Sequence, residues 1–330
     1  MENENHEHHV HKKENRYSVP IAIVIAAIII SGSYYLSNKN AAERIVASKN
    51  SVQKTQAQVS EIEEAVTPSN GVVLPVIWGD LGKQLVDSGA IDAEKFKAIY
   101  KNRGQFTDEH DQLLLGQNNG KLKITKENSG YILNLLWALG LANSNPILDS
   151  GEMTDSKYGG AGNFASTGGW TISSGKPMDH YSRHSFITLT PEQQALVDRV
   201  SSGIYRPCCG NSTHFPDCNH GMAMLGFLEL MASQGVNEKD MYSAALTLNS
   251  YWFPDTYMTI LEYMKMKGIA WSDTSPQEIL GFTYSSGQGF ARISSQVPQQ
   301  VERSGGGGCG VDTGETVSAP VQEQQSGCGV

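Results

Sequence analysis

An uncharged apolar run near the N-terminus sets the strongest limit on how this chain of 330 residues can fold. The segment from Tyr17 to Leu36 carries no charged side chain, and about 20 helical residues cross the hydrocarbon core of a membrane. Lys12, Lys13 and Arg16 precede the run, so the positive-inside tendency places the N-terminus in the cytosol and the rest of the chain outside. We therefore predict a single membrane anchor over residues 17–37.

The alternative interpretation of this run is a cleaved signal peptide, because Ser31-Gly32-Ser33 supplies small residues at suitable cleavage positions. Both interpretations place the main domain at the outer side of the cell membrane, where thiols are often oxidised to disulfides. The net charge of −9 and the lack of a basic stripe argue against nucleic acid as a partner. The partner predicted for the N-terminal helix is the membrane itself.

Composition and hydrophobic periodicity divide the rest of the chain into four parts. Residues 1–16 form a polar, His-rich cytosolic tail, and residues 38–71 form a helical stalk whose narrow apolar stripe suits pairing with a second copy. Residues 72–292 form a globular domain dominated by helical patterns, and residues 293–330 form a Gly- and Gln-rich tail. The predicted fold class is mainly α: an N-terminal transmembrane helix followed by a helical extracytoplasmic domain with a long Gly-rich loop.

Within the domain, side chains that suit helix N-caps mark several helix starts. The predicted caps are Asp92, Thr190 and Ser275, and further helices are predicted to start at Thr107 and Asn237.

Other element boundaries are predicted from apolar patterns. We expect a helix over Trp78–Ser88, a short strand over Lys121–Thr125, and a helix capped by Thr125 that ends near Leu141. Asn219 is the predicted cap of a helix over His220–Gln234.

The Gly/Ser-rich segment 147–177 is too long for a simple connection, and it contains Tyr158, Phe164 and Trp170. Disordered linkers are poor in aromatic residues, so we expect an ordered loop packed over the functional site.

The chemistry of the sequence is concentrated in thirteen residues. Cys208, Cys209, His214, Cys218 and His220 lie in this short stretch, and thiolate and imidazole are ligands of zinc, copper(I) and similar ions. The start of the following helix is expected to lower the pKa of Cys218. The sequence thus predicts that these five residues hold a copper or zinc ion.

Four further side chains are candidates for the same site. His180 and His184 lie four residues apart and would join it if their segment folds back, or they serve as loop hydrogen-bond partners. Met222 and Met224 offer thioether sulfur, which favours copper(I), but methionine is more often a core residue.

Disulfide chemistry is the main alternative for the cluster. Cys218 can pair with Cys208 or Cys209, or the adjacent Cys208 and Cys209 can form a reducible pair. The alternative functions are therefore a thiol–disulfide oxidoreductase or redox sensor, and a disulfide-stapled envelope interaction protein without catalytic activity.

The order Pro207-Cys208-Cys209-Gly210, then His214, then Asp217-Cys218, resembles bacterial surface proteins named for a Pro-Cys-Tyr-Cys-Gly-Cys motif. Those proteins carry a His and an Asp-Cys shortly after the motif. The Tyr between the cysteines and the third Cys are missing here. The resemblance implies an exported cysteine and histidine site and gives no activity.

Two more thiols lie in the C-terminal tail. Cys309 and Cys328 are both flanked by glycine, and they are predicted to exchange an ion or a disulfide with the core cluster or with a partner protein. Intermolecular crosslinking is the alternative role.

Enzyme classes fit the sequence less well. The chain has no Gly-x-Ser-x-Gly elbow. Glu192, Glu229 and Glu262 lie on predicted helices and leave open a carboxylate-dependent wall hydrolase, although solvated helix faces explain them more simply. The sequence favours a membrane-anchored protein that binds or transfers a soft metal ion over an enzyme.

Overall fold

The computed structural model describes residues 59–298. The predicted anchor at 17–37, both tails and the larger part of the stalk lie outside the described residues. The chain divides into two compact units, residues 1–60 and 61–330, and nearly all of the described residues belong to the second. Between residues 59 and 298, no helix combines the length and the apolar content needed to cross a membrane.

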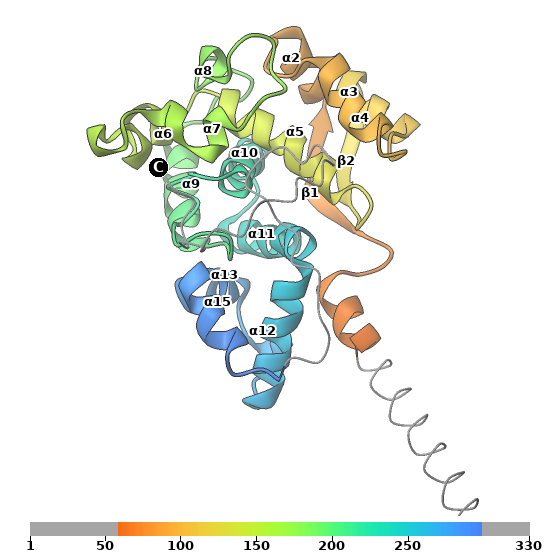
Figure 1. The fold of residues 1–330 in the computed structure, drawn as a ribbon, viewed down its shortest axis with the longest axis vertical. Helices are drawn as coiled ribbons and strands as arrows, with labels where there is room; N and C mark the ends of the chain where they lie inside the picture. The colour runs from red at the N-terminus through yellow and green to blue at the C-terminus, as the bar shows by residue number, and fades with distance from the viewer. Residues whose placement is uncertain (1–58, 299–330) are drawn as a thin grey trace, which may run out of the picture. The chain divides into compact units, whose positions relative to one another are not determined.

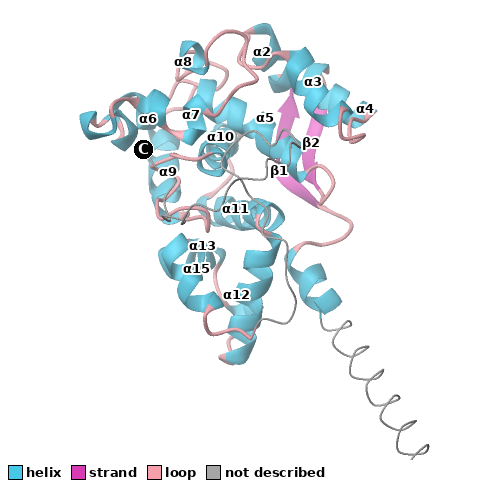
Figure 2. Ribbon diagram, in the orientation of Figure 1, coloured by secondary structure: helices cyan, strands magenta, loops and turns pink. Residues whose placement is uncertain are grey.

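The described domain is mainly helical, as predicted, with one antiparallel pair of strands (Figures 1 and 2). Its centre is formed by α5 (Ser129–Ala142) and α10 (Asn219–Ser233), which pack directly against each other. A Cβ atom at Gly140 would lie 2.0 Å from the carbonyl oxygen of Met222, and one at Gly226 would lie 2.6 Å from the nitrogen of Gly140. Glycine at these two positions therefore allows the two backbones to touch.

Both central helices are buried on nearly all sides, which agrees with their almost continuous apolar sequences. Some of the remaining α-helices pack on this pair, and those nearest the C-terminus pack on α11 (Glu238–Trp252) or on one another. The bounds of the remaining α-helices are α2 (Leu81–Asp87), α3 (Ala93–Lys101), α4 (Asp108–Leu115), α6 (Pro146–Ser150), α7 (Ala165–Gly168), α8 (Pro177–His180), α9 (Pro191–Gly203), α11 (Glu238–Trp252), α12 (Pro254–Met266), α13 (Pro276–Leu280), α14 (Phe282–Ser285) and α15 (Gly287–Ser294).

The sheet consists of β1 (Val72–Gly79) and β2 (Asn119–Ile124). The prediction of a helix over Trp78–Ser88 was wrong at its start, because Trp78 belongs to β1 and the helix α2 begins only at Leu81. Alternate residues of β1 are buried, namely Leu74, Val76 and Trp78. The outward-facing Val73 and Ile77 are also apolar. The sequence of β1 therefore lacks the alternation of apolar and polar residues that indicates a half-buried strand.

The N-caps predicted at Asp92, Thr190 and Ser275 are confirmed, and the helices predicted to start at Thr107 and Asn237 also begin at cap residues. Asp92, Thr107, Thr190, Asn237 and Ser275 each accept a hydrogen bond from a backbone N–H in the first turn of the following helix. Local side-chain chemistry at a helix start therefore determined these boundaries.

Two predicted caps were wrong. Thr125 accepts a hydrogen bond from the N–H of Asn128 in a turn, and α5 begins four residues later at Ser129. Cys218, and not Asn219, is the N-cap residue of α10.

The Gly-rich segment 147–177 is ordered, as predicted. It contains α6, α7 and three short 3₁₀ helices, η1 (Glu152–Thr154), η2 (Ser156–Tyr158) and η3 (Ala161–Asn163).

Aromatic residues fix this segment to the rest of the domain. Trp170 is buried and donates from Nε1 to the carbonyl oxygen of Ala90 at 2.8 Å. Phe164 packs edge-to-face on Phe215, with ring centroids 5.4 Å apart, so the segment covers the residues just before Cys218.

The end of the predicted stalk belongs to the packed domain. Residues 61–66 are helical, and Ile62 and Val66 are buried in the core. Tyr251 Oη then donates to the carbonyl oxygen of Pro68 at 2.6 Å. Packing against the domain therefore begins before residue 72.

Candidate metal centre

The cysteine-rich stretch is the connection between α9 and α10, and it folds back on itself. Tyr205 and Ser212 form an antiparallel bridge, and the N–H of Thr213 donates to the carbonyl oxygen of Ile204 at 2.8 Å. This hairpin places the adjacent cysteines at its tip near the residue that starts α10.

The hairpin brings together Cys208, Cys209 and Cys218, whose sulfur atoms all lie within 4.8 Å of one another. The sulfurs of Cys208 and Cys218 are 3.5 Å apart, and none of the three cysteines forms a disulfide. Cys218 is fully buried and Cys209 is buried, whereas Cys208 is partly exposed. Between residues 59 and 298, no other group of three or more Cys, His, Asp or Glu side chains has ligand atoms gathered in this way.

A buried arginine holds this cluster from inside the loop. Arg206 donates from Nε to the sulfur of Cys218 at 2.9 Å, and from Nη2 to Oδ1 of Asp217 at 2.5 Å. Its remaining donors reach the carbonyl oxygens of Asn211 and Phe215 at 3.2 and 3.1 Å. One side chain thus ties both ends of the loop together.

Asp217 completes this polar network. Its second carboxylate oxygen accepts a hydrogen bond from Nδ2 of Asn211 at 2.8 Å. Burial raises the pKa of Asp217, against the opposing effect of Arg206. Because both members of the Arg206–Asp217 ion pair are almost fully buried, removing either one alone would leave an uncompensated charge.

The three thiols differ in acidity. Burial alone would raise the pKa of Cys218, but hydrogen bonds from Cys208 and Cys209, the charge of Arg206 and an interaction with His220 outweigh it and hold that pKa well below its usual range. The bond with Cys208 lowers the pKa of Cys209, yet its bond to Cys218 and its burial raise it to about 12. Bonds to Cys209 and Cys218, with burial, raise the pKa of Cys208. These contacts therefore favour ionisation of Cys218 over ionisation of Cys208 or Cys209.

The predicted effect on Cys218 is confirmed, although the helix is not the main reason. Cys218 lies at the positive end of the macrodipole of the fifteen-residue helix α10. The specific contacts that lower its pKa come from the other two cysteines, Arg206 and His220. Of these, only Arg206 was not connected to Cys218 by the sequence.

Neither predicted histidine ligand belongs to the group of gathered sulfur atoms. His214 turns toward α9, with its Nε2 3.9 Å from Oδ1 of Asp198. His220 is buried beside Phe253, with ring centroids 4.3 Å apart, and its Nδ1 has no hydrogen-bond partner. A side-chain hydrogen bond between His220 and Cys218 nevertheless helps to lower the pKa of Cys218.

The other candidate ligands have structural surroundings of their own. His180 and His184 bond to each other, with Nδ1 and Nε2 3.1 Å apart, and Nε2 of His180 bonds to the carbonyl oxygen of Ser174 at 2.8 Å. This is the loop hydrogen-bonding role that the sequence left open. Met222 and Met224 are buried in the core.

One of the three candidate glutamates is unusual. Glu229 on α10 is fully buried, and burial raises its pKa to about 8 against the effect of hydrogen bonds from the amides of Asn145 and Asn143. Glu192 is exposed and Glu262 is only partly buried.

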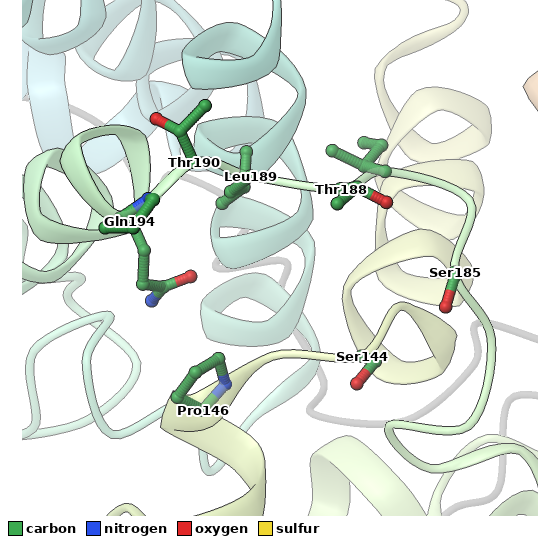
Figure 3. A pocket seen from close by; sticks show the side chains of 9 residues that line it. Ser144, Pro146, Ser185, Thr188, Leu189, Thr190 and Gln194 are labelled. Atoms are coloured by element: carbon green, nitrogen blue, oxygen red, sulfur yellow. The ribbon is translucent and has the colours of Figure 1, made fainter.

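A cavity of about 380 Å³ lies beside the network of Glu229 (Figure 3). Gln194 in its wall donates to Oδ1 of Asn145, but no charged side chain and no cysteine lines the cavity. Its lining therefore contains serine and threonine hydroxyls but no carboxylate, imidazole or thiol. Its lining residues are Ser144, Pro146, Ser185, Ile187, Thr188, Leu189, Thr190, Pro191 and Gln194.

Comparisons of the chain with protein-family models, curated proteins and solved structures give no match. Its function is therefore argued from the chemistry of the cysteine cluster.

Proposed function

We propose that this chain binds or transfers a soft metal ion, copper or zinc, through Cys208, Cys209 and Cys218. The observation that carries the proposal is the convergence of three sulfur atoms within 4.8 Å of one another. A metal–thiolate bond measures about 2.3 Å, so three sulfurs around one ion lie about 4 Å apart. Small shifts of these side chains would therefore bring all three sulfurs into contact with one ion.

Electrostatics also support an ion at this position. Binding would convert Cys208 and Cys209 to thiolates next to the thiolate of Cys218, and a cation stabilises that negative charge. Arg206 supplies further positive charge on the inner side. Partly exposed Cys208 offers an entry point for a small ion.

A role in thiol–disulfide exchange is the second candidate, because the sulfurs of Cys208 and Cys218 lie only 3.5 Å apart. The burial of the Cys218 sulfur argues against thiol–disulfide exchange. The low-pKa sulfur of Cys218 is fully buried, whereas partly exposed Cys208 has a raised pKa. Exchange requires an accessible thiolate, so the arrangement suits an entering ion better than a protein disulfide.

The deciding experiment measures metal and thiols on the same sample. The full chain is purified in detergent without added metal or reductant, and bound elements and free thiols are counted. We expect about one equivalent of copper or zinc, lost in Cys208→Ser and Cys218→Ser.

Cys309→Ser and Cys328→Ser are matched controls, since they remove thiols from the tail and should leave the stoichiometry unchanged. If the chain holds neither ion, even after loading with copper(I) or zinc, the proposal is wrong. Loss of the thiols of Cys208 and Cys218 together, without metal, would instead support the disulfide alternative.

The membrane anchor over residues 17–37 and pairing of copies through the stalk remain proposals. Protease protection in sealed vesicles tests the anchor: the described domain should be cleaved from the extracytoplasmic side only. Cleavage from the cytosolic side would reverse the proposed orientation.

A further inference from the structure

A positive charge is fixed unusually close to the proposed ion position. Arg206 is almost completely buried, and its Nε lies 2.9 Å from the sulfur of Cys218. An ion bound to that sulfur at about 2.3 Å would lie within roughly 5 Å of the guanidinium group.

The guanidinium cannot easily move away from this position. Four hydrogen-bonded partners hold it, and the backbone of α10 lies against its flat face. A Cβ atom at Gly221 would lie only 2.5 Å from Cζ of Arg206. The charge is therefore a permanent part of the site.

This charge acts unequally on different ions. Coulomb repulsion scales with the charge of the ion, so the guanidinium opposes a divalent ion twice as strongly as a monovalent one. Asp217 offsets part of that repulsion through its ion pair with Arg206. The balance between these two residues should therefore set the preference between zinc and copper(I).

The number of ligands in the cluster also favours copper(I) over zinc. Thiolates bind both zinc and copper(I), but zinc sites in proteins almost always have four ligands, whereas copper(I) is stable with three. Between residues 59 and 298, the gathered ligand set comprises three sulfur atoms. The hydrogen bond from Arg206 also approaches the sulfur of Cys218 from one side, which leaves less room for a fourth ligand there.

We propose that Arg206 is a specificity-determining residue that makes the cluster a three-coordinate site for monovalent copper and disfavours zinc. The inference rests on the proposed metal-binding function and names the ion of that same site.

The test compares ion preference between variants of the full chain. The affinities for copper(I) and for zinc are each measured by competition with a chromophoric chelator, and their ratio is taken for each variant. In Arg206→Met/Asp217→Asn both buried charges are removed together, so no single charge is left unpaired.

We expect the ratio to shift toward zinc in this double variant, but by less than the effect of one isolated unit charge about 5 Å away, because the simultaneous loss of the Asp217 carboxylate offsets part of the loss of the guanidinium. Arg206→Lys keeps the charge and should keep most of the preference.

A second variant keeps the inference testable if the double variant does not fold. Asp217→Asn alone leaves the positive charge without its partner, so the ratio should move in the opposite direction, toward copper(I). Near-ultraviolet circular dichroism reports whether each variant is folded. X-ray absorption of the copper-loaded protein should show three sulfur ligands.

Each result has one meaning. If the original chain binds neither ion, the proposed function itself is wrong. If it binds an ion at the cysteines but the ratio is the same in all folded variants, only the role of Arg206 is wrong. Four ligands around copper would also overturn the three-coordinate site.

Discussion

The α-carbon of Gly221 lies against the guanidinium group of Arg206, so closely that a Cβ atom there would come within 2.5 Å of Cζ. This contact joins the first turn of α10 to the buried charge that holds the cysteine loop. A side chain as small as a methyl group would therefore disturb the metal centre without touching a cysteine.

Gly221→Ala should accordingly weaken both the fold and the site. Inserting a methyl group into a packed interior costs roughly 1–3 kcal/mol, and here displacement of Arg206 would also remove its bond to Cys218. Chemical denaturation and copper(I) affinity measure the two effects. Gly130→Ala is the matched control, since Gly130 is also in the first turn of a helix and a Cβ atom there meets nothing within 4 Å. Equal behaviour of the two variants would contradict the proposed contact.

Cys218 should titrate separately from the other two cluster thiols. In a Cys309→Ser/Cys328→Ser background, the metal-free protein should show the ultraviolet absorption of one thiolate well below the ordinary thiol pKa of about 8.5. The signal should be absent in Cys218→Ser. Because the pKa of Cys218 is lower in the folded state than in the unfolded state, its ionisation stabilises the fold at any pH above the unfolded-state pKa. This stabilisation is lost as the pH falls through the folded-state pKa. A thiolate signal that survives in Cys218→Ser would show that another cysteine carries the charge.

The sequence predicted much of this fold because many signals are local. The helix starts at Thr190, Asn237 and Ser275 depend on residues within one turn, and they are correct. The strand β1 was missed because its exposed positions Val73 and Ile77 are apolar, so burial on one face could not be distinguished from burial on both.

The candidate site was predicted only in part. The three cysteines were identified from their spacing, and the structure gathers them. Arg206 and Asp217 were not recognised as parts of the site, although residues of opposite charge flank the cysteine stretch at its two ends. His214 is three residues from Asp217, yet it turns toward Asp198. Ligand type can be read from a sequence, whereas side-chain direction in a loop depends on long-range packing.

Glu229 should make stability depend on pH in the opposite sense to Cys218. Burial raises the pKa of Glu229 from 4.5 to about 8, so the folded state retains a proton that the unfolded state loses. Stability should therefore fall as the pH rises from about 4.5 to about 8, by roughly 4 to 5 kcal/mol in total at about 1.4 kcal/mol per unit.

Glu229→Gln isolates this effect, because it removes the titration and leaves Cys218 unchanged. The free energy of unfolding of Glu229→Gln minus that of the original chain should grow steadily over this pH range. Any fixed cost of placing an amide beside Asn143 and Asn145 adds a constant only. Glu152→Gln removes an exposed carboxylate in the same way and serves as the matched control. A difference for Glu229→Gln that does not change with pH would mean that Glu229 is ionised in the fold.

The tail thiols are expected to speed delivery of the ion to the cluster. The N–H of Gly287 donates to the carbonyl oxygen of Cys209 at 2.8 Å. The last described helix, α15, therefore starts beside the cysteine loop. The helix α15 is about 12 Å long, and the described chain ends four residues later at Pro298. Cys309 follows eleven residues further on, which span up to about 40 Å.

Cys309 can therefore reach partly exposed Cys208 from Pro298. In the exchange, copper(I) moves from the sulfur of Cys309 to that of Cys208, and the proton of the Cys208 thiol passes to the Cys309 thiolate. A tethered thiol has an effective concentration of roughly millimolar, so Cys309→Ser/Cys328→Ser should slow loading from micromolar copper(I) at least tenfold while leaving stoichiometry and affinity unchanged. Ser304→Ala and Ser326→Ala change the same tail without removing thiols and should load normally. Stopped-flow loading at the same rate in all variants would show that the tail cysteines serve another purpose, such as crosslinking between chains.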